Sequence, residues 1–448
     1  MANFSKSNVP QFSVDVYQNE YLPEGGREVN AIVTVSSTGG GTIGGAVAAP
    51  HLYAPGQGPS AAVAIMVDCS GSMDYPPTKM RGARDATAAA IDALRDGVHF
   101  AVVGGTHIAK EVYPGGGRLA VADATTRDQA KQALRRLSAG GGTAIGTWLK
   151  LADRLLSSED AAIRHGILLT DGRNEHESPE DLRAALDASA GRFTCDARGV
   201  GTDWEVKEVT GIASALLGTA DIIADPTGLA ADFTQMMETA MGKEVADVAL
   251  RLWTPMGTEI KFVKQVAPTV EELTERRTEA GPRAGDYPTG SWGDESRDYH
   301  VCVKVPAADI GQEMLAARVS LVIPQPDGTV HNLGAQGLVR AVWTEDMAAS
   351  TSINPQVAHY TGQAELAQVI QQGLDARKSG DVDGATAKLG RAVQLASESG
   401  NADTAKLLAK VVDVVDAAAG TVRLKAKVAE ADEMTLETRS TKTVRVKK

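Results

Sequence analysis

The chain has 448 residues, of which 43% are hydrophobic and 23% are charged, and its formal net charge is −12. This length exceeds what one hydrophobic core supports, so we expect two or three domains, and the composition excludes wholesale disorder. The negative charge disfavours nucleic acid and anionic membrane surfaces as partners.

The amino terminus and the cysteines predict a cytoplasmic protein. The first residues, MANFSKSNVPQF, lack a basic region followed by an apolar stretch, so we expect no signal peptide. No apolar run approaches the ~20 residues that a membrane span needs. Cys69, Cys195 and Cys302 are odd in number and widely spaced, which predicts buried free thiols in a reducing compartment.

Half-buried strands come first, and an α/β pattern follows them. Apolar side chains alternate with polar ones over residues 11–38, which is typical of strands with one buried face. Within residues 59–243, apolar runs such as AAVAIMV and HGILLT predict buried strands, and stretches such as KMRGARDATAAAIDALRD between them have helical spacing. This alternation predicts a Rossmann-like α/β domain, with an open parallel sheet and helices on both faces.

Alternating apolar residues return near residue 245, and Asp327–Gly328 supplies a hairpin-type turn. The strands before residue 59 are too few to bury a core alone. We therefore predict that residues 1–58 and 245–345 form one antiparallel β-sandwich with the α/β domain inserted in it; two separate β elements are the alternative. Residues 267–297, rich in charges, prolines and glycines, are expected to form a long loop.

The carboxy-terminal part predicts helices followed by a tail. Asn354–Pro355 is typical of a helix start, and three apolar stripes at helical spacing follow it. We expect a helical hairpin or three-helix bundle over residues 354–418. Residues 420–448 are expected to form a basic, flexible tail, because the final RSTKTVRVKK carries five positive charges and no negative ones.

Small oxygen-bearing side chains gather where the predicted parallel strands end. AAVAIMV leads into DCSGSM, HGILLT leads into DG, and a glycine-rich loop, SAGGGTAIGT, leads into a helix. Ligands of such sheets bind beyond the carboxyl ends of the strands, so neighbouring strands would bring five side chains together: Asp68, Ser70, Ser72, Thr143 and Asp171. Two carboxylates and three hydroxyls suit a hard cation, Mg²⁺ first, with Mn²⁺ or Ca²⁺ as alternatives. Because hydroxyls supply much of this shell, the metal would stay electrophilic and keep an open position.

The same segments argue against an enzyme. GGGTAIGT lacks the lysine of a phosphate-binding loop and does not have the G-x-G-x-x-G spacing. Ser70 is not flanked by glycines as in a nucleophile elbow. His165 is interpreted as an internal strand residue rather than a general base. We therefore predict no catalytic residue and no organic cofactor; a metal-dependent hydrolase is a remote alternative without a positioned general base.

Taken in order and at their separations, DCSGSM, GGGTAIGT and LLTDG resemble the von Willebrand factor A domain family with a complete metal-ion-dependent adhesion site. The resemblance covers residues 59–243. It implies that the same five residues hold the metal, the serines and the threonine by direct coordination and the aspartates often through water. The flanking segments are similar, less specifically, to a β-rich arm around this domain.

We accordingly expect a non-catalytic, metal-dependent adaptor or scaffold that captures the Asp or Glu carboxylate of a protein partner. The loops 74–79 and 173–178 would supply specificity. Two alternatives stay open. The chain could be an accessory subunit of an ATP-driven machine of the AAA+ or chelatase type, with the ATPase on a separate protein, or the metal could only stabilise the domain.

The tail suggests a second kind of partner. Thr438, Thr441 and Thr443 lie among basic residues, where phosphorylation would add about −1.5 to −2 charges. The spacing of Thr441 and Thr443 from later valines resembles ligands of phosphothreonine-reading domains, whereas a merely solvated tail is the alternative.

Overall fold

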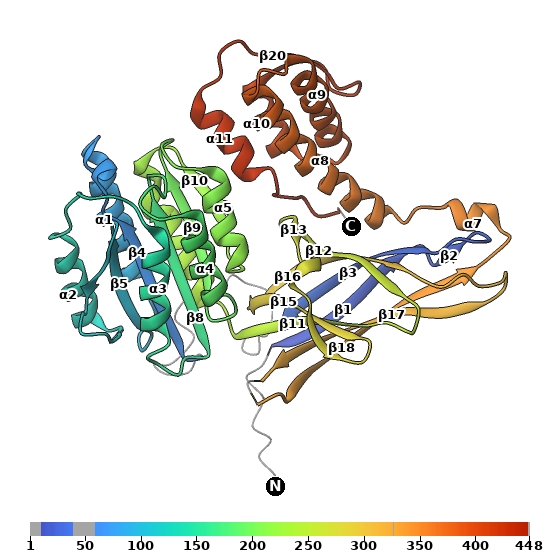
Figure 1. Ribbon diagram of the computed structural model, residues 1–448, viewed down its shortest axis with the longest axis horizontal. Helices are drawn as coiled ribbons and strands as arrows, with labels where there is room; N and C mark the ends of the chain where they lie inside the picture. Colours follow the sequence, from blue (N-terminus) through green and yellow to red (C-terminus); the bar gives the residue numbers. More distant parts are fainter. Residues whose placement is uncertain (1–9, 39–58, 326, 447–448) are drawn as a thin grey trace, which may run out of the picture. The chain divides into compact units, whose positions relative to one another are not determined.

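The structure is a computed structural model that describes residues 10–38, 59–325 and 327–446 (Figure 1). Its chain divides into two compact units. The first comprises residues 59–246 with 290–293, and the second comprises residues 10–38, 247–289 and 294–446 among those described.

The first unit is built on a seven-stranded sheet whose long central strand is buried along its whole length. Strands run parallel in the order β10-β9-β8-β4-β5, and two antiparallel strands, β6 and β7, pair with β5. Their bounds are β4 Ala61–Asp68, β5 His99–Gly105, β6 Ala109–Tyr113, β7 Ala120–Val121, β8 Ile163–Thr170, β9 Thr194–Val200 and β10 Ala220–Ile223. Because β4 lies between β8 and β5, the chain reverses its winding direction there, which is where such sheets bind ligands.

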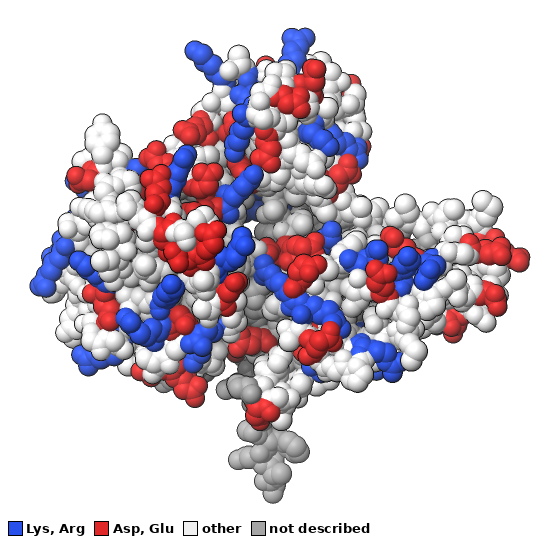
Figure 2. All heavy atoms as spheres, in the orientation of Figure 1, with Lys and Arg blue, Asp and Glu red and all other residues white. Residues whose placement is uncertain are grey.

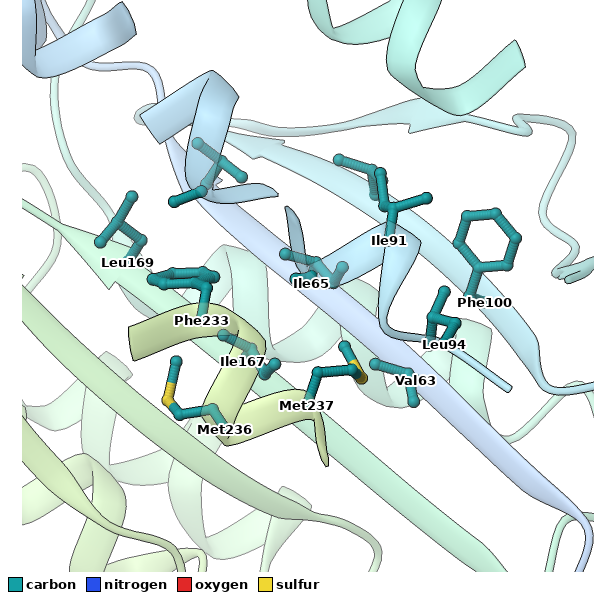
Figure 3. Close-up of a cluster of buried hydrophobic side chains, with 14 of the residues drawn as sticks. Val63, Ile65, Ile91, Leu94, Phe100, Ile167, Leu169, Phe233, Met236 and Met237 are labelled. Atoms are coloured by element: carbon teal, nitrogen blue, oxygen red, sulfur yellow. The ribbon is translucent and has the colours of Figure 1, made fainter. Parts of the chain in front are cut away.

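Helices cover both faces of this sheet (Figure 1), as the alternating sequence pattern predicts. They are α1 Thr78–Asp92, α2 Ala124–Leu134, α3 Ile145–Leu156, α4 Pro179–Ser189, α5 Val206–Ala215 and α6 Leu229–Met241, with short 3₁₀ turns at Gly71–Asp74 and Pro226–Gly228. Figure 3 shows Ile65 and Ile167, from the two central strands, beneath Phe233 and Met237 of α6. Burying such side chains fully stabilises the fold by roughly 1.5–3 kcal/mol each.

The second unit contains two further sheets. The first has the order β1-β3-β16-β12-β13, with bounds Gln11–Gln18, Glu28–Thr38, Glu295–Lys304, Glu259–Ala267 and Glu271–Glu272. The second has the order β14-β15-β11-β17-β18-β2, with bounds Thr278–Gly281, Ala284–Trp292, Val245–Trp253, Glu313–Pro324, Val330–Trp343 and Tyr21–Leu22. Antiparallel pairing of β3 with β16 therefore places strands from both sides of the α/β unit in one sheet.

Contacts between β1 and β18 join these two sheets. The Gln18 side chain donates to the carbonyl of Arg340 at 2.7 Å and accepts from the Arg340 N–H at 2.8 Å. A Cβ added at Gly337 of β18 would lie 2.6 Å from Val16. Glycine is needed here because a side chain would push the strands apart.

The expected loop over residues 267–297 is wrong, because this stretch holds β13, β14, all of β15 and the start of β16. Some of its charged residues are paired within the sheet instead of being solvated. Arg251 of β11 donates to both carboxylate oxygens of Asp286 in β15, at 2.7 and 2.8 Å. Charge and proline content alone therefore predicted a loop for a segment that forms strands.

Helices follow the β-rich part, as the apolar stripes predict. A short helix, α7 Met347–Thr351, precedes α8 Pro355–Lys378, α9 Val382–Glu398 and α10 Ala402–Val411, and a hairpin of β19 Val412–Asp416 with β20 Thr421–Leu424 follows. Asn354 caps α8 by accepting from the Gln356 N–H at 2.9 Å. Leu374, Leu389 and Leu408 share one buried core. No helix in the described part of the chain is long and apolar enough to cross a bilayer.

The flexible tail expected over residues 420–448 is wrong for residues 420–446, and residues 447 and 448 lie outside the described residues. The segment contains β20 and a further helix, α11 Glu430–Arg439, whose Leu436 is fully buried in the helical core. Thr438 is also buried, and its hydroxyl donates to the Met434 carbonyl at 2.7 Å. The Thr443 hydroxyl donates to the Val266 carbonyl at 2.7 Å. These hydroxyls are engaged inside the fold and are not presented by a solvated tail.

Asp298 of β16 anchors the last described residues. Both of its oxygens accept from Arg445, at 3.0 Å from Nε and 2.9 Å from Nη2, and Oδ1 also accepts from Thr34 at 2.6 Å. The Tyr360 hydroxyl of α8 donates to Oδ2. Because Asp298 is only 3% exposed, these partners offset the cost of burying its carboxylate.

The three cysteines are buried and free, which confirms that part of the prediction. Burial raises the pKa of Cys69 and of Cys302 to about 12, so neither thiol is a reactive thiolate. On the face shown in Figure 2, acidic and basic side chains are interspersed, as a net charge of −12 with 45 Lys and Arg residues allows.

Arg445→Ala tests whether the carboxy-terminal segment stabilises the second unit. It should lower local stability by about 1–2 kcal/mol, because a charged hydrogen bond to a buried carboxylate is lost while Thr34 and Tyr360 remain. Native-state hydrogen exchange of α8 and β16 amides reads this change. Arg423→Ala, on an exposed position of β20, is the control and should change neither element; equal protection in both variants would show that the segment contributes nothing.

Candidate metal centre

Two neighbouring strands bring the predicted aspartates to one edge of the first sheet. β4 ends at Asp68 and β8 ends at Thr170, and Val67 pairs in parallel register with Leu169. Asp68 therefore stands level with Thr170, and Asp171 is the next residue beyond the sheet. Both aspartates are fully buried.

Hydrogen bonds fix Asp68 below the turn that carries the two serines. Its Oδ1 accepts from the Ser70 N–H at 2.8 Å, and its Oδ2 accepts from the Thr170 hydroxyl at 2.7 Å. The Ser70 and Ser72 hydroxyl oxygens lie 3.0 Å apart, and Ser72 Oγ donates to Asp171 Oδ1 at 2.7 Å. The alternate spacing of DCSGSM thus places both hydroxyls at the edge where the strand leaves the sheet.

The glycine-rich loop brings Thr143 to the same place. Backbone hydrogen bonds hold this loop against the serine turn, from Gly140 N–H to the Cys69 carbonyl and from Gly71 N–H to the Gly141 carbonyl, both at 2.9 Å. Gly141 has φ +83°, a conformation that favours glycine. Thr143 is 5% exposed, whereas Ser72 lies exposed at the rim.

Gly172 keeps the space beside the three hydroxyls open. A Cβ added at this residue would lie 3.2 Å from Ser72 Oγ, 3.6 Å from Thr143 Oγ1 and 4.0 Å from Ser70 Oγ. All three oxygens therefore surround one small volume, which a methyl group would partly fill. The five predicted residues converge, and two carboxylates with three hydroxyls form a donor set that fits a hard divalent cation.

No cluster of three or more His, Cys, Asp or Glu side chains that could hold a metal occurs in the described ranges. A cradle made mainly of hydroxyls is a different donor set, so the two findings agree. His165 is buried near the opposite end of β8 from Asp171, with Nδ1 2.9 Å from Thr194 Oγ1 and Nε2 3.0 Å from Asp196. Its interpretation as an internal strand residue is confirmed.

Burial changes the acidity of Asp68. Desolvation raises the pKa of this carboxyl to about 6, against the lowering effect of the hydrogen bonds from Ser70 and Thr170, and the nearby charge of Asp171 raises it further. Protons would therefore compete with a metal cation for the Asp68 carboxylate in mildly acidic solution.

Sequence reasoning included Lys79 only as the last residue of the loop 74–79 and missed its role at the site; it is the second residue of α1. Its ammonium donates to Asp171 Oδ2 at 2.8 Å and to Asp203 Oδ2 at 3.2 Å. Burial disfavours its charge, but the hydrogen bonds and charges of the two carboxylates outweigh this and raise the pKa of Lys79. Nothing in the local pattern marks this lysine, because its partners come from two other strand ends. Thr170, just before Asp171 in LLTDG, was visible as a polar residue ending an apolar strand.

The loop 173–178 faces partly inward. Asn174 Oδ1 accepts from the Ile145 N–H at 2.7 Å, and Glu177 Oε1 accepts from the Gly146 N–H at 2.6 Å. His176 Nδ1 accepts from the Thr143 N–H at 3.2 Å. These contacts cap α3 and position Thr143, so these three side chains help to build the site, and the role of the loop in specificity stays a prediction.

The fold and this cradle define a class of protein that sequence comparison also identifies. A family model described as the von Willebrand factor type A domain matches residues 61–222, which span β4 to β10. A second, described as the von Willebrand factor type A C-terminal domain, matches residues 394–440, which include α10 and α11. No curated protein matches the chain significantly.

Solved structures extend the likeness to the whole chain. A protein titled von Willebrand factor type A from Catenulispora acidiphila is 53% identical, with 99% of each chain covered and a TM-score of 0.90. The chain therefore belongs to the von Willebrand factor type A family. The ArnB paralog VWA2 from Sulfolobus acidocaldarius shares the fold at 14% identity, with a TM-score of 0.57 over 96% of this chain and 98% of that one. Proximal thread matrix protein 1 from the mussel byssus, with a zinc-occupied MIDAS motif, is 24% identical over 41% of this chain and 46% of that one, at a TM-score of 0.35.

Gly172→Ala should weaken Mn²⁺ binding by at least about tenfold. The new methyl group would lie against all three hydroxyls and would keep them from coordinating one ion together. Isothermal titration calorimetry of the metal-free protein measures the affinity. Gly211→Ala is the matched control, since its Cβ would meet nothing within 4 Å on α5. It should leave Mn²⁺ affinity unchanged. Wild-type affinity in Gly172→Ala would contradict the location of the site.

Acid should release the metal. Because the pKa of Asp68 is about 6 and a cation binds the ionised carboxylate, Mn²⁺ affinity should fall by up to about tenfold for each pH unit below 6. The stability of the metal-free protein should move the other way: a raised acid pKa means that protonation favours the folded state, so stability rises as pH falls through 6 toward 4. Asp68→Asn should abolish that rise. Metal affinity that stays constant from pH 7 to 5 would contradict this assignment.

Proposed function

We propose that the protein is a divalent-metal-dependent adaptor that binds a protein partner by its Asp or Glu carboxylate, at an intact metal-ion-dependent adhesion site. The observation that carries this proposal is the convergence of three hydroxyls around the space beside Gly172, above two buried carboxylates. Asp68, Ser70, Ser72, Thr143 and Asp171 would hold the ion, with Mg²⁺ as the proposed cation.

The balance of charge supports capture rather than simple ion storage. The cradle offers only two carboxylates, and Lys79 already pairs with one of them. When bound, a divalent cation would supply a Lewis-acidic position that the protein's own anions do not saturate. A carboxylate from another molecule is the oxygen ligand that best satisfies that position.

The rim of the site supports a protein partner. Tyr75, directly after the serine turn, is 83% exposed, and Ile108, in the loop after β5, is 55% exposed. His107 in that loop lies against the glycine-rich loop, because a Cβ at Gly141 would approach its ring to 2.9 Å. Exposed aromatic and aliphatic side chains beside a polar anchor are typical of protein interfaces.

The surroundings of the cradle support a non-catalytic role. The Nδ1 atom of His176 and Glu177 Oε1, which are candidates for a general base, accept backbone hydrogen bonds from Thr143 and Gly146. The Lys79 ammonium is held by two carboxylates. These atoms are thus engaged in building the site, which supports a non-catalytic role. A cytoplasmic location is proposed on the three buried free thiols.

A pull-down from native lysate tests this function after Mg²⁺ binding has been measured directly. Wild-type protein in Mg²⁺ should retain a partner that is lost in EDTA and in Asp68→Ala, because the cradle then holds no cation. Asp160→Ala is the control: this aspartate is exposed at the opposite end of β8 and should keep the partner. The captured partner should also lose binding when its own contacting Asp or Glu is changed to Asn or Gln.

The other outcomes separate the alternatives. Partners that are the same in Mg²⁺, EDTA and Asp68→Ala, together with metal binding in the wild type, would make the metal structural and overturn carboxylate capture. A ring-forming ATPase retained regardless of metal would favour the accessory-subunit role instead.

A further inference from the structure

Lys79 is a buried cation placed directly against the cradle. The residue is 7% exposed, and its Nζ lies 2.8 Å from Asp171 Oδ2. Its methylene stem runs past Gly201, where an added Cβ would lie 3.7 Å from Lys79 Cε. Burying an ammonium is costly unless it is paired, so this side chain has a defined position and not a fluctuating surface one.

Asp171 divides its two oxygens between the cradle and the lysine. Oδ1 accepts from Ser72 Oγ at 2.7 Å, and Oδ2 accepts from Lys79 at 2.8 Å. The second partner of the lysine, Asp203, has a side chain that is 69% exposed, so water screens its charge far more than that of Asp171. The close, dry pair is therefore the one between Lys79 and Asp171.

This pairing sets the charge that a cation meets. Asp68 and Asp171 together carry two negative charges, and Lys79 offsets one of them. With Lys79 in place, a divalent ion leaves the centre with one net positive charge; without it, the two aspartates alone would neutralise the ion. The charges of Lys79 and Asp171 are buried and interact strongly, because their surroundings screen them less than bulk water does.

We propose that Lys79 is a built-in counter-charge of the metal centre, which weakens metal binding and in exchange leaves the loaded site positively charged for a carboxylate ligand. The part about the ligand rests on the proposed function, whereas the part about the metal does not. Lys79 also keeps Asp171 paired in the metal-free protein, so the cradle stays assembled between metal-binding events.

A counter-charge is distinguished from a merely structural lysine because its removal changes the Mn²⁺ affinity and the acetate affinity in opposite directions. Lys79→Gln keeps amide donors near Asp171 but removes the charge, and Lys79→Met removes both. Both variants should bind Mn²⁺ at least about tenfold more tightly than wild type at pH 7.5, because a like charge next to the ion is gone. Binding of acetate to the Mn²⁺-loaded protein should become weaker by a similar factor. A lysine that only supports the fold would instead lower both affinities.

The experiment uses the full chain, with Mn²⁺ affinity read from the free-ion electron paramagnetic resonance signal and acetate binding read from solvent proton relaxation. Lys79→Arg, which keeps the charge, should stay within about threefold of wild type. Lys150→Met, at an exposed position of α3, controls for loss of one charge elsewhere in the unit. Circular dichroism verifies that each variant is folded, and Lys79→Gln stands in if Lys79→Met is not.

The outcomes separate this inference from the proposed function. Mn²⁺ affinity that is unchanged or lower in both neutral variants overturns the counter-charge. Tighter Mn²⁺ binding, with no acetate binding in any variant, supports the effect of Lys79 on the metal and overturns carboxylate capture together with the ligand half of the proposal. Tighter metal binding with weaker acetate binding supports the whole.

Discussion

The candidate site depends on the hydrogen bonds that the buried carboxylate of Asp68 accepts, of which the shortest come from the Ser70 N–H and from the Thr170 hydroxyl. The first ties the carboxylate to the turn that carries the serines, and the second ties it to the neighbouring strand. Because Asp68 is fully buried, losing either donor would leave its carboxylate poorly hydrogen-bonded away from water. This cost holds the serine turn and the strand end in place. Ser72 then reaches Asp171, and the glycine-rich loop closes over the same turn through the backbone of Cys69 and Gly71.

A second carboxylate organises the other unit in a comparable way. Asp298 lies in β16, opposite Thr34 of β3, and it is also bound by Tyr360 of α8 and by Arg445 near the end of the chain. Four segments that are far apart in the sequence thus share one buried anion. Both units use a buried acid as an organising centre, but that of the first unit lies next to three hydroxyls that surround a small space beside a glycine, where a cation can enter.

Sequence reasoning predicted the parts of the site that local pattern determines. Asp68, Ser70 and Ser72 follow a strand at fixed spacing, and Asp171 ends a second apolar run, so parallel pairing alone brings them together. Sequence reasoning failed for residues whose position depends on a partner far away in the sequence. Lys79 is buried because Asp171 and Asp203 receive it, and the basic carboxy-terminal segment is ordered because Asp298 binds Arg445. Likewise, Asp286 lies in a strand because Arg251 faces it, although its surroundings in the sequence resemble a loop. Charge counts cannot reveal such pairings.

The most direct test of the central claim is the location of a cation by anomalous scattering from crystals soaked in Mn²⁺. The account predicts a peak within coordination distance of the Ser70, Ser72 and Thr143 hydroxyls, beside Gly172 and close to Asp68 and Asp171. It would be contradicted by a peak at another place in the chain with none at these hydroxyls, or by Lys79 occupying the cradle at saturating Mn²⁺.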